Sequence, residues 1–393
     1  MKIADIQATP INIPYEAPYR WMPGVCPGNT TTIVEVTTDE NLVGIGEASS
    51  GRSAPVIAEE LAPRLVGADP FDIEACERRC VREERLDYHR GDQSALTAFA
   101  GIEMALWDLR GKAWQQPLYK LLGGACRKSI PFTEYFAYRE RKGHAGGEST
   151  PKAVAAYCAK MRELHGSVYF EGKPPVDTRA TIEIAREVRS AVGDDAMIRL
   201  DGNMGFSLTA ARHVLSQIEP YNINNFEEPV ASFYDMAKLR QHSAIPFSSH
   251  IPDLRLAVRL GVPDNMVLNF SQLGGIGRTL RFVGACEAMD VGYWCYSGES
   301  AVGSAAYLHF AAALQHIHQP SQSLFRWQAD DVTEDGPFSP KNGVLSVPEG
   351  PGLGVTLSPK ALQRCHERFL AEGAYDGYLD PTRPDYFARI PLA

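Results

Sequence analysis

Three side chains that could bind a hard cation follow short hydrophobic runs at regular intervals in the sequence. They are Asp201 in IRLDGN, Glu227 in NFEEP and His250 in PFSSH. Two carboxylates and an imidazole supply oxygen and nitrogen ligands, and three protein ligands leave room for water and substrate oxygens. The three residues therefore form a candidate site for a divalent cation.

The segments that carry these residues alternate with helical patterns. β-branched or aromatic runs precede each candidate ligand, and amphipathic stretches such as 181–192 and 208–218 lie between them. Strands that alternate with helices are typical of βαβ units and a parallel sheet. In a closed barrel of such units, the carboxyl ends of the strands open onto one face, where the active site lies. Three successive strands would therefore bring the three ligands together.

The remaining segments indicate the rest of a barrel and a second domain. Alternating residues at 2–15 and 30–49 predict an antiparallel sheet, and a helical block follows at 54–122. Further strand patterns occur at 130–138, 168–173, 266–271, 292–296 and 323–327. A chain of 393 residues is long enough for one barrel of about 250 residues and a smaller domain.

Composition argues against several classes of partner. The net charge is −9 and the sequence has no run rich in Lys or Arg, so we expect no nucleic-acid partner. No apolar run approaches the 18 residues of a membrane-spanning helix, and we expect no membrane partner. The eight cysteines are scattered, as expected for reduced thiols of a cytoplasmic enzyme.

Five motifs carry a specific resemblance to a known family. They are GIEMALWDLRGKAWQQPLYKLLGG (101–124), AVGDDAMIRLDGN (191–203), NFEEP (225–229), LGGIGRTL (273–280) and PGLGV (351–355). In order and spacing the chain resembles the enolase superfamily, in its mandelate racemase and muconate-lactonizing branch. The nearest pattern within that branch is that of the galactarate-type acid-sugar dehydratases.

The resemblance implies an α/β fold with two parts. A modified TIM-type (β/α)7β barrel is expected at 126–335, and an α+β capping domain at 1–125. The sequence becomes rich in Pro and Gly after Asp335, so we expect 336–393 to return to the capping domain.

The resemblance also implies one Mg²⁺ at the ends of the third, fourth and fifth barrel strands. Its ligands would be Asp201, Glu227 and His250, because the family uses the first Glu of Glu-Glu-Pro. His250 is a departure, since most of the branch has Asp, Glu or Asn there. The shared chemistry is abstraction of a proton α to a carboxylate, which gives a metal-stabilised enediolate.

The base is the second departure. The family's second strand ends in Lys-x-Lys, whereas this chain reads Tyr169-Phe170-Glu171-Gly172-Lys173. Alignment on AVGDD puts Tyr169 and Glu171 near the family lysines, with a shift of one or two residues possible. Because alternate residues share one strand face, we expect Lys173 and Tyr169 to act as a coupled pair, and Glu171 between them to contact the substrate.

The third departure is on the opposite face of the site. The racemases of the family use a His on the seventh strand, oriented by an Asp on the sixth. This chain has Asn269 on the sixth strand, and the seventh ends in Trp-Cys-Tyr-Ser-Gly-Glu. The missing dyad favours a one-base elimination over two-base racemisation.

Substrate contacts are expected from both domains. Arg20 and Trp21 lie in a region that forms a flexible loop in the family, and Arg20 could grip a carboxylate. Tyr88 is a candidate acid from the capping domain. In the barrel, Asn203 shares the strand face of Asp201, and Tyr296 follows the seventh strand.

These observations predict a Mg²⁺-dependent sugar-acid dehydratase, a hydro-lyase that yields a 2-keto-3-deoxy acid. Its partner would be a small carboxylate substrate, on a chain that we expect to form a homo-oligomer. An epimerase or cycloisomerase is the alternative within the family. An acid-binding pseudoenzyme is the alternative outside it, because the family lysine pair is missing.

Overall fold

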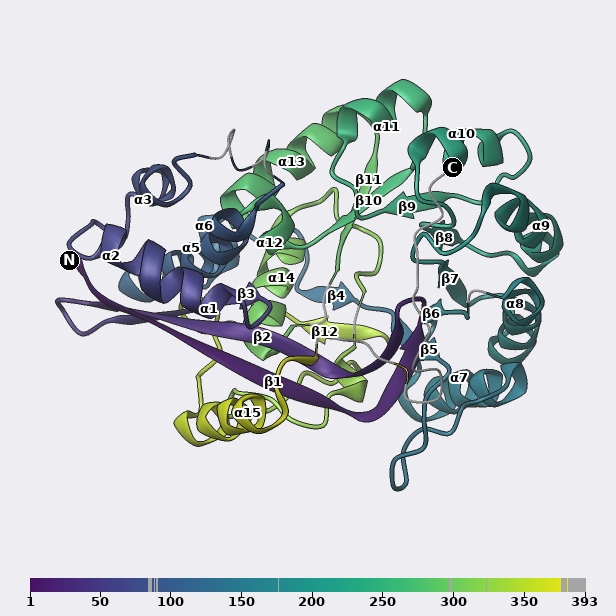
Figure 1. Ribbon diagram of the computed structural model, residues 1–393, viewed down its shortest axis with the longest axis horizontal. Coiled ribbons are helices and arrows are strands. Elements are labelled where there is room, and N and C mark those ends of the chain that lie inside the picture. Colours follow the sequence, from purple (N-terminus) through teal and green to yellow (C-terminus); the bar gives the residue numbers. More distant parts are fainter. Residues whose placement is uncertain are drawn as a thin grey trace.

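The computed structural model describes residues 1–83, 87, 89, 91–175, 177–296, 299–322, 324–375 and 380 (Figure 1). An antiparallel sheet of three long strands begins the chain, as predicted. Its strands are β1 (Ile3–Trp21), β2 (Gly24–Thr38) and β3 (Val43–Ser49). A helical layer follows, with α1 (Ser53–Pro55), η1 (Val56–Leu61), α2 (Ala62–Leu65), α3 (Ile73–Cys80), α5 (Ser94–Ala113) and α6 (Leu118–Leu121).

Helix α5 lies directly on the sheet because glycines allow its backbone to approach. A Cβ on Gly46 of β3 would lie 2.1 Å from the carbonyl oxygen of Gly101 in α5. A Cβ on Gly101 would in turn lie 2.7 Å from Ala48. The two elements can therefore pack backbone to backbone only with glycine at these positions.

Seven parallel strands form the core of the barrel, in the order in which they follow along the chain. They are β5 (Glu134–Ala137), β6 (Tyr169–Lys173), β7 (Met197–Asp201), β8 (Asn225–Glu227), β9 (Phe247–Ser249), β10 (Asn265–Leu268) and β11 (Gly292–Cys295). Helices cover the outside of these strands (Figure 1). They are α7 (Pro151–His165), α8 (Thr178–Val192), α9 (Leu208–Ile218), α10 (Phe233–Arg240), α11 (Leu254–Leu260), α13 (Ile276–Ala288) and α14 (Ala301–Ala313). The short helix α12 (Phe270–Leu273) follows β10, and η2 (Glu219–Tyr221) follows α9. The fold is therefore the predicted α/β barrel with a capping layer.

The prediction of a strand at 323–327 was wrong. Phe325–Trp327 form the 3-10 helix η3, and both aromatic side chains are buried. The place between β11 and the start of β5 is taken by a shorter extended segment. Gln322 N donates to the carbonyl of Cys295, and Ser321 N donates to the carbonyl of Pro131. Backbone hydrogen bonds on both sides of residues 321–322 therefore close the ring.

The chain after the barrel runs back along the first sheet. Strand β12 (Val344–Ser346) pairs with β4 (Ser129–Pro131), and α15 (Pro359–Glu372) packs against β1. The guanidinium of Arg368 in α15 donates to the carbonyl of Asn12 in β1. The two ends of the chain therefore contribute to one side of the molecule.

Two buried carboxylates of the capping layer bind the backbone N–H groups in the first turns of two barrel helices. Glu47 of β3 accepts hydrogen bonds from the backbone N–H groups of Ser300 and Gly303 at the start of α14. Glu103 of α5 accepts hydrogen bonds from those of Ile276 and Gly277 at the start of α13. An anion is favoured there because the first N–H groups of a helix lack partners within the helix. These contacts fix the capping layer to the barrel.

None of the helices in the described residues is long and apolar enough to span a membrane. All eight cysteines are free thiols, in agreement with the expected reduced state.

Candidate active site

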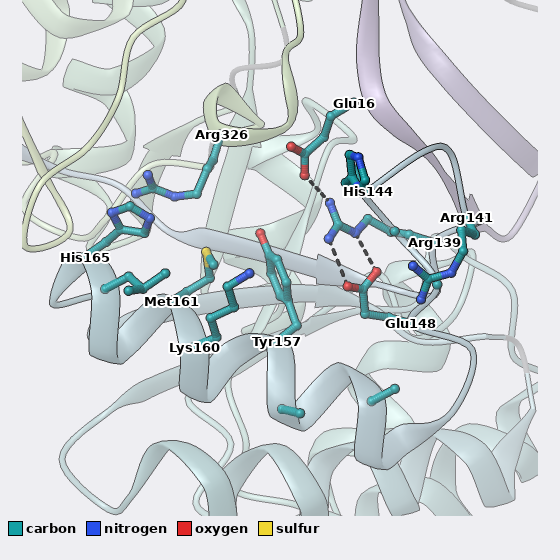
Figure 2. A pocket seen from close by; sticks show the side chains of 16 residues that line it. Glu16, Arg139, Arg141, His144, Glu148, Tyr157, Lys160, Met161, His165 and Arg326 are labelled. Atoms are coloured by element: carbon teal, nitrogen blue, oxygen red, sulfur yellow. Dashed lines mark hydrogen bonds and ion pairs between the residues drawn. The ribbon is translucent and has the colours of Figure 1, made fainter.

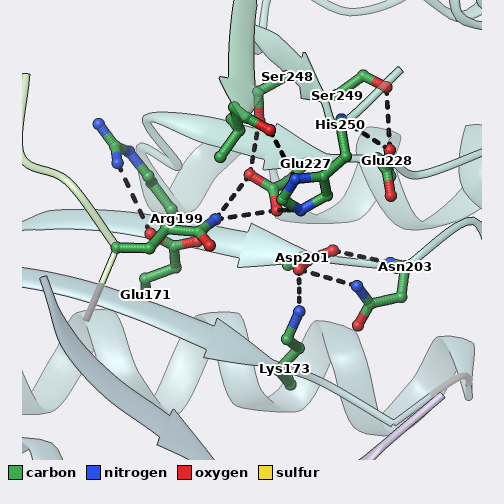
Figure 3. Close-up of polar contacts among 12 residues, drawn as sticks. Glu171, Lys173, Arg199, Asp201, Asn203, Glu227, Glu228, Ser248, Ser249 and His250 are labelled. Atoms are coloured by element: carbon green, nitrogen blue, oxygen red, sulfur yellow. Dashed lines mark hydrogen bonds and ion pairs between the residues drawn. The ribbon is translucent and has the colours of Figure 1, made fainter. Parts of the chain in front are cut away.

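The three candidate ligands converge at the carboxyl ends of neighbouring strands (Figure 3). Asp201 is the last residue of β7, Glu227 is the last of β8, and His250 directly follows β9. One ligand atom from each side chain lies within 4.8 Å of the other two. The convergence follows from the parallel register, in which Asp201 lies opposite Glu227.

The imidazole of His250 is held in an orientation that suits a metal ligand. Its Nδ1 donates a hydrogen bond to the carbonyl of Val267 at 2.6 Å. Its Nε2 lies 2.9 Å from Oε1 of Glu227. A backbone acceptor at Nδ1 selects the tautomer whose Nε2 is free to bind a cation. Burial lowers the pKa of His250, but the carboxylates of Glu227 and Glu228 outweigh it and raise this pKa to about 10.

The two carboxylates are buried and already oriented. Asp201 accepts hydrogen bonds from the backbone and side-chain amides of Asn203, at 2.8 and 3.0 Å. Glu227 accepts one from the hydroxyl of Ser248 at 3.0 Å. Burial raises the pKa of Asp201 to about 7. Burial also acts to raise that of Glu227, but His250 lowers it below its usual range. With their charge concentrated in a buried site, these three donors fit a divalent cation.

Lys173 completes the group from the neighbouring strand. It is the last residue of β6, and its buried ammonium forms an ion pair with Oδ2 of Asp201. The ammonium also lies 5.4 Å from the centre of the Trp21 ring. Burial acts to lower the pKa of Lys173, but Asp201 and Glu227 outweigh burial, so that the pKa is raised overall. The structure therefore brings the predicted base next to the predicted ligands (Figure 3).

Tyr169 does not reach this group, and the predicted pairing of Tyr169 with Lys173 was wrong. Tyr169 is the first residue of β6, about 13 Å along the strand from Lys173. Its ring lies against Gly343, where an added Cβ would meet it at 3.0 Å. The alignment on AVGDD was therefore wrong by two residues. Lys173 lies at the end of the strand, and Glu171 lies two residues before it.

Glu171 lies below the cavity rather than in its wall, which corrects its predicted contact with substrate. Its carboxylate is fully buried and lies 3.6 Å from the guanidinium of Arg199. Arg199 stacks on the ring of Trp294 at 3.7 Å. Burial, together with the charge of Glu227, raises the pKa of Glu171 to about 8. Glu171 is therefore part of the polar layer that supports the ligands.

Gln322 is a site residue that the sequence did not reveal. Its amide nitrogen donates to both oxygens of Glu227 at 2.9 Å and also to Glu171. It therefore separates two carboxylates that would otherwise repel each other. No motif marks this position, because Gln322 belongs to the short segment that closes the ring and was not part of any predicted strand.

A cavity of about 460 Å³ opens above Lys173 and His250. Three of the predicted substrate-binding residues line it: Trp21, Asn203 and Tyr296. The ring of Tyr296 lies edge-on to that of His250, with centroids 5.5 Å apart. The remaining described lining residues are Met22, Ser49, Thr97, Met204, Glu228, Asn269, Ser271 and Gln272.

Arg20 is not among the residues that line this cavity, and the structure contradicts its predicted role. Its guanidinium forms ion pairs with Glu140 at 2.7 Å and with Asp380 at 2.6 Å. The expected flexible loop at residues 15–30 is instead a hairpin of β1 and β2, in which Trp21 pairs with Gly24. The hairpin directs Trp21 to the cavity and Arg20 away from it. Tyr88, the predicted acid, lies outside the described residues.

The residues in place of the racemase dyad have structural roles. Asn269 caps α12, and its side chain accepts a hydrogen bond from Gln272 N. His309 is buried in α14, where it donates from Nε2 to the carbonyl of Leu353 and accepts at Nδ1 from Tyr119 N. Burial lowers the pKa of His309 to about 4. His309 is therefore a neutral core residue.

A second cavity, of about 620 Å³, lies along α7 and away from the strand ends (Figure 2). Arg139 lies in it, but Glu148 binds this guanidinium at 2.9 and 3.0 Å, and Glu16 binds it at 2.7 Å. Within the described residues, the potential metal ligands are Asp201, Glu227 and His250, and His250 lines the other cavity. The strand-end cavity is therefore the candidate active site.

Comparison with known families agrees with this fold. Residues 7–123 match the mandelate racemase / muconate lactonizing enzyme N-terminal domain, and residues 148–361 match the enolase C-terminal domain-like family. The chain therefore belongs to the mandelate racemase/muconate lactonizing enzyme branch of the enolase superfamily.

Relatives carry out more than one reaction, according to their names. The chain is 26% identical over 376 residues to D-mannonate dehydratase from Caulobacter sp. strain K31, covering 84% of this chain and 90% of the relative. It is 29% identical over 379 residues to chloromuconate cycloisomerase from Cupriavidus necator, covering 91% and 97%. A solved enolase described as a putative sugar isomerase, from Streptomyces coelicolor, superposes with a TM-score of 0.87 at 28% identity, covering 96% of this chain and all of that one.

Proposed function

We propose that this protein is a Mg²⁺-dependent dehydratase of a sugar acid. It would remove the proton α to the carboxylate and the β-hydroxyl, and release a 2-keto-3-deoxy acid. The observation that carries this proposal is the position of Lys173, which lines the same cavity as His250. Its ammonium also pairs with Asp201, one of the three convergent candidate ligands.

The chain's own groups have distinct parts in the proposed reaction. Asp201, Glu227 and His250 would hold the cation, which when bound acts as a Lewis acid on the substrate carboxylate. Lys173 is the basic side chain that contacts the Asp201 ligand. Once its ammonium has given up a proton, the neutral Nζ would accept the α-proton. Asn203 holds the Asp201 carboxylate in place through two hydrogen bonds.

Elimination is favoured over racemisation by the opposite face of the cavity. Asn269 and Tyr296 occupy that face, and neither is a base of the racemase kind. Loss of the β-hydroxyl as water leaves an enol, which tautomerises to the keto acid without a second base at the α-carbon. The mannonate dehydratase relative supports this reaction class. The cycloisomerase relative supports the alternative of intramolecular lactonisation.

The test is a panel of aldonic, aldaric and muconic acids incubated with the protein and Mg²⁺. Keto-acid formation with loss of one water supports the dehydratase. Lactone formation without loss of water would instead establish a cycloisomerase, and binding without any turnover would establish a pseudoenzyme. Activity that survives exhaustive chelation would contradict the metal-dependent mechanism.

A further readout does not depend on activity. Mg²⁺ should raise the melting temperature of the wild-type protein, because a ligand that binds only the folded state stabilises it. The rise should be absent in Glu227→Gln and retained in Tyr169→Phe, whose ring is far from the ligands. An equal rise in all three proteins would place the cation elsewhere.

A further inference from the structure

The charges around the candidate active site are unevenly distributed. Among the described lining residues, Lys173 and His250 are the side chains able to carry positive charge, and both lie at the metal end. Each already faces a buried carboxylate, Lys173 with Asp201 and His250 with Glu227. The described lining therefore offers no spare cation at the end away from the ligands.

A further carboxylate makes this cavity unfavourable for a second negative charge. Glu228 lines the cavity, and its Oε1 accepts hydrogen bonds from the Ser249 hydroxyl and from His250 N, both at 2.9 Å. These donors are neutral, and the imidazole of His250, which could balance the charge of Glu228, already faces Glu227. A dianionic substrate would add a second negative charge to a cavity whose lining already carries this carboxylate.

The far end of the cavity is instead built for neutral groups. Hydroxyl side chains come from β3, α5 and α12, at Ser49, Thr97 and Ser271. Such groups both donate and accept hydrogen bonds, which matches the hydroxyls of a polyol chain. Trp21 lies beside them and offers an apolar face to the C–H groups of such a chain.

Arg20, which the sequence suggested as a partner for a substrate carboxylate, already forms ion pairs within the protein. Arg20 is bound by Glu140 and Asp380 and is absent from the described lining residues. Releasing it would leave Asp380, whose side chain is fully buried, without this ion pair.

We propose that the substrate is a monocarboxylate of the aldonate type, whose far end is an uncharged hydroxyl, and not a dicarboxylate of the aldarate type. This inference rests on the dehydratase function proposed above. It concerns only the group at the far end of the substrate, since both classes share the carboxylate at the metal.

The test compares acids that differ only in the terminal group: gluconate with glucarate, galactonate with galactarate, and mannonate with mannarate. The protein is assayed with Mg²⁺ on each pair for keto-acid formation. For the stereochemistry that is turned over, kcat/KM should favour the aldonate by about tenfold or more. An equal or higher value for the matched aldarate would overturn the inference and leave the dehydratase function standing. If no member of any pair is dehydrated, the dehydratase function fails and this inference falls with it.

A substitution that adds a positive charge tests whether the charge of the lining causes the preference for aldonates. Thr97→Arg adds a cation to the far wall, and Thr209→Arg adds the same side chain on the exposed face of α9 as a control. The preference for aldonate over aldarate should fall by about tenfold in Thr97→Arg and stay unchanged in Thr209→Arg. A folded Thr97→Arg protein with the wild-type preference would show that the lining charge does not set the specificity.

Discussion

Buried carboxylates occur in two regions of this molecule, and their surroundings are opposite. In the candidate active site, Glu171, Asp201 and Glu227 lie close together, with three cationic side chains and one amide against them. Between the capping layer and the barrel, Glu47 and Glu103 each accept hydrogen bonds from backbone amides at the start of a helix and from one neutral side chain, the Ser300 hydroxyl and the Trp107 indole respectively. Residue type and burial are the same in both regions, so the difference lies in what faces each carboxylate.

This difference distinguishes carboxylates that stabilise the fold from carboxylates that are available for function. A single carboxylate at the start of a helix meets N–H groups that need an acceptor, so both groups gain. Carboxylates that face one another repel, and the repulsion persists until a cation or a proton arrives. The pKa values of Glu171 and Asp201 rise to about 8 and about 7, with burial as the first cause and the neighbouring carboxylates adding to it. The site therefore holds negative charge that a divalent cation can neutralise.

The largest effect should come from removing a ligand of the site. Asp201→Asn should lower kcat/KM by about ten-thousandfold, because the Lewis acid contributes several kcal/mol. Steady-state kinetics with the substrate found in the acid panel will measure this. Asp108→Asn, a buried carboxylate of the capping layer, is the matched control and should keep its turnover at 25 °C. Similar losses in both variants would mean that the two regions do not differ in this way.

The next largest effect concerns the base. Lys173→Met should reduce kcat by about a hundred- to ten-thousandfold, because it removes the group that accepts the proton. Exchange of the α-proton in deuterated water, followed by NMR, should be lost together with turnover. Tyr169→Phe should stay close to wild type in both measurements, since its ring lies at the other end of β6. Retained exchange in Lys173→Met would assign the base to another residue.

A smaller effect is expected from removal of the metal. At a Mg²⁺ concentration of about 100 times Kd, the free energy of unfolding should rise by about 2.7 kcal/mol. Urea titrations with Mg²⁺ or with a chelator will measure the rise. Asp201→Asn should show none, whereas Asp108→Asn should show the full rise. The opposite pattern would put the cation at the capping layer.

The carboxylates of the capping layer should affect stability instead. Asp108 accepts hydrogen bonds from Ile45 N at 2.9 Å and from Leu353 N at 2.7 Å. Asp108→Asn should reduce the free energy of unfolding by about 1–3 kcal/mol, because a buried N–H loses its acceptor. The exposed Glu59→Gln should stay within about 0.5 kcal/mol of wild type in the same urea titration. A loss no larger than that of Glu59→Gln would show that the hydrogen bonds of Asp108 do not stabilise the fold.

The smallest effect is a gradual dependence of stability on pH. Burial raises the pKa of Glu103 from 4.5 to about 7. Between these values the unfolded chain has released the proton while the folded protein keeps it, so stability should fall as pH rises through this window. Urea unfolding of wild type and Glu103→Gln at pH 5 and pH 7.5 will test this. The decline should be shallower in the variant, and parallel profiles would contradict the assignment.

The convergence of the three candidate ligands could be predicted because their positions follow from local patterns. Each of the three residues lies at the end of a short hydrophobic run, and an amphipathic stretch separates one run from the next. The strand ends of a parallel barrel share one face. Asp201, Glu227 and His250 therefore converge whatever the precise lengths of the intervening helices. The order of the strands and the antiparallel first sheet followed from the same periodicities.

The base was harder because several residues of one strand satisfy the same local rule. Tyr169, Glu171 and Lys173 alternate on one strand face, and nothing local says which of them ends the strand. Pairing with β5 and β7 decides this, since Phe170 lies opposite Ile198 and Ala137 lies opposite Lys173. A shift of two residues along the strand leaves a side chain on the same face of the sheet but moves it towards or away from the strand end. The sequence therefore left both Tyr169 and Lys173 as candidates.

By itself, the sequence determined the class of fold, the family and the three residues that form the candidate cation site, because short-range periodicity and motif spacing encode them. Only the tertiary structure decided which residue of β6 reaches the site, that Gln322 separates Glu171 from Glu227, and that Arg20 is bound to Asp380. The physical reason is sequence distance. Arg20 and Asp380 are 360 positions apart, and Gln322 is 151 positions from Glu171. Their contacts exist only after the ring of strands has closed.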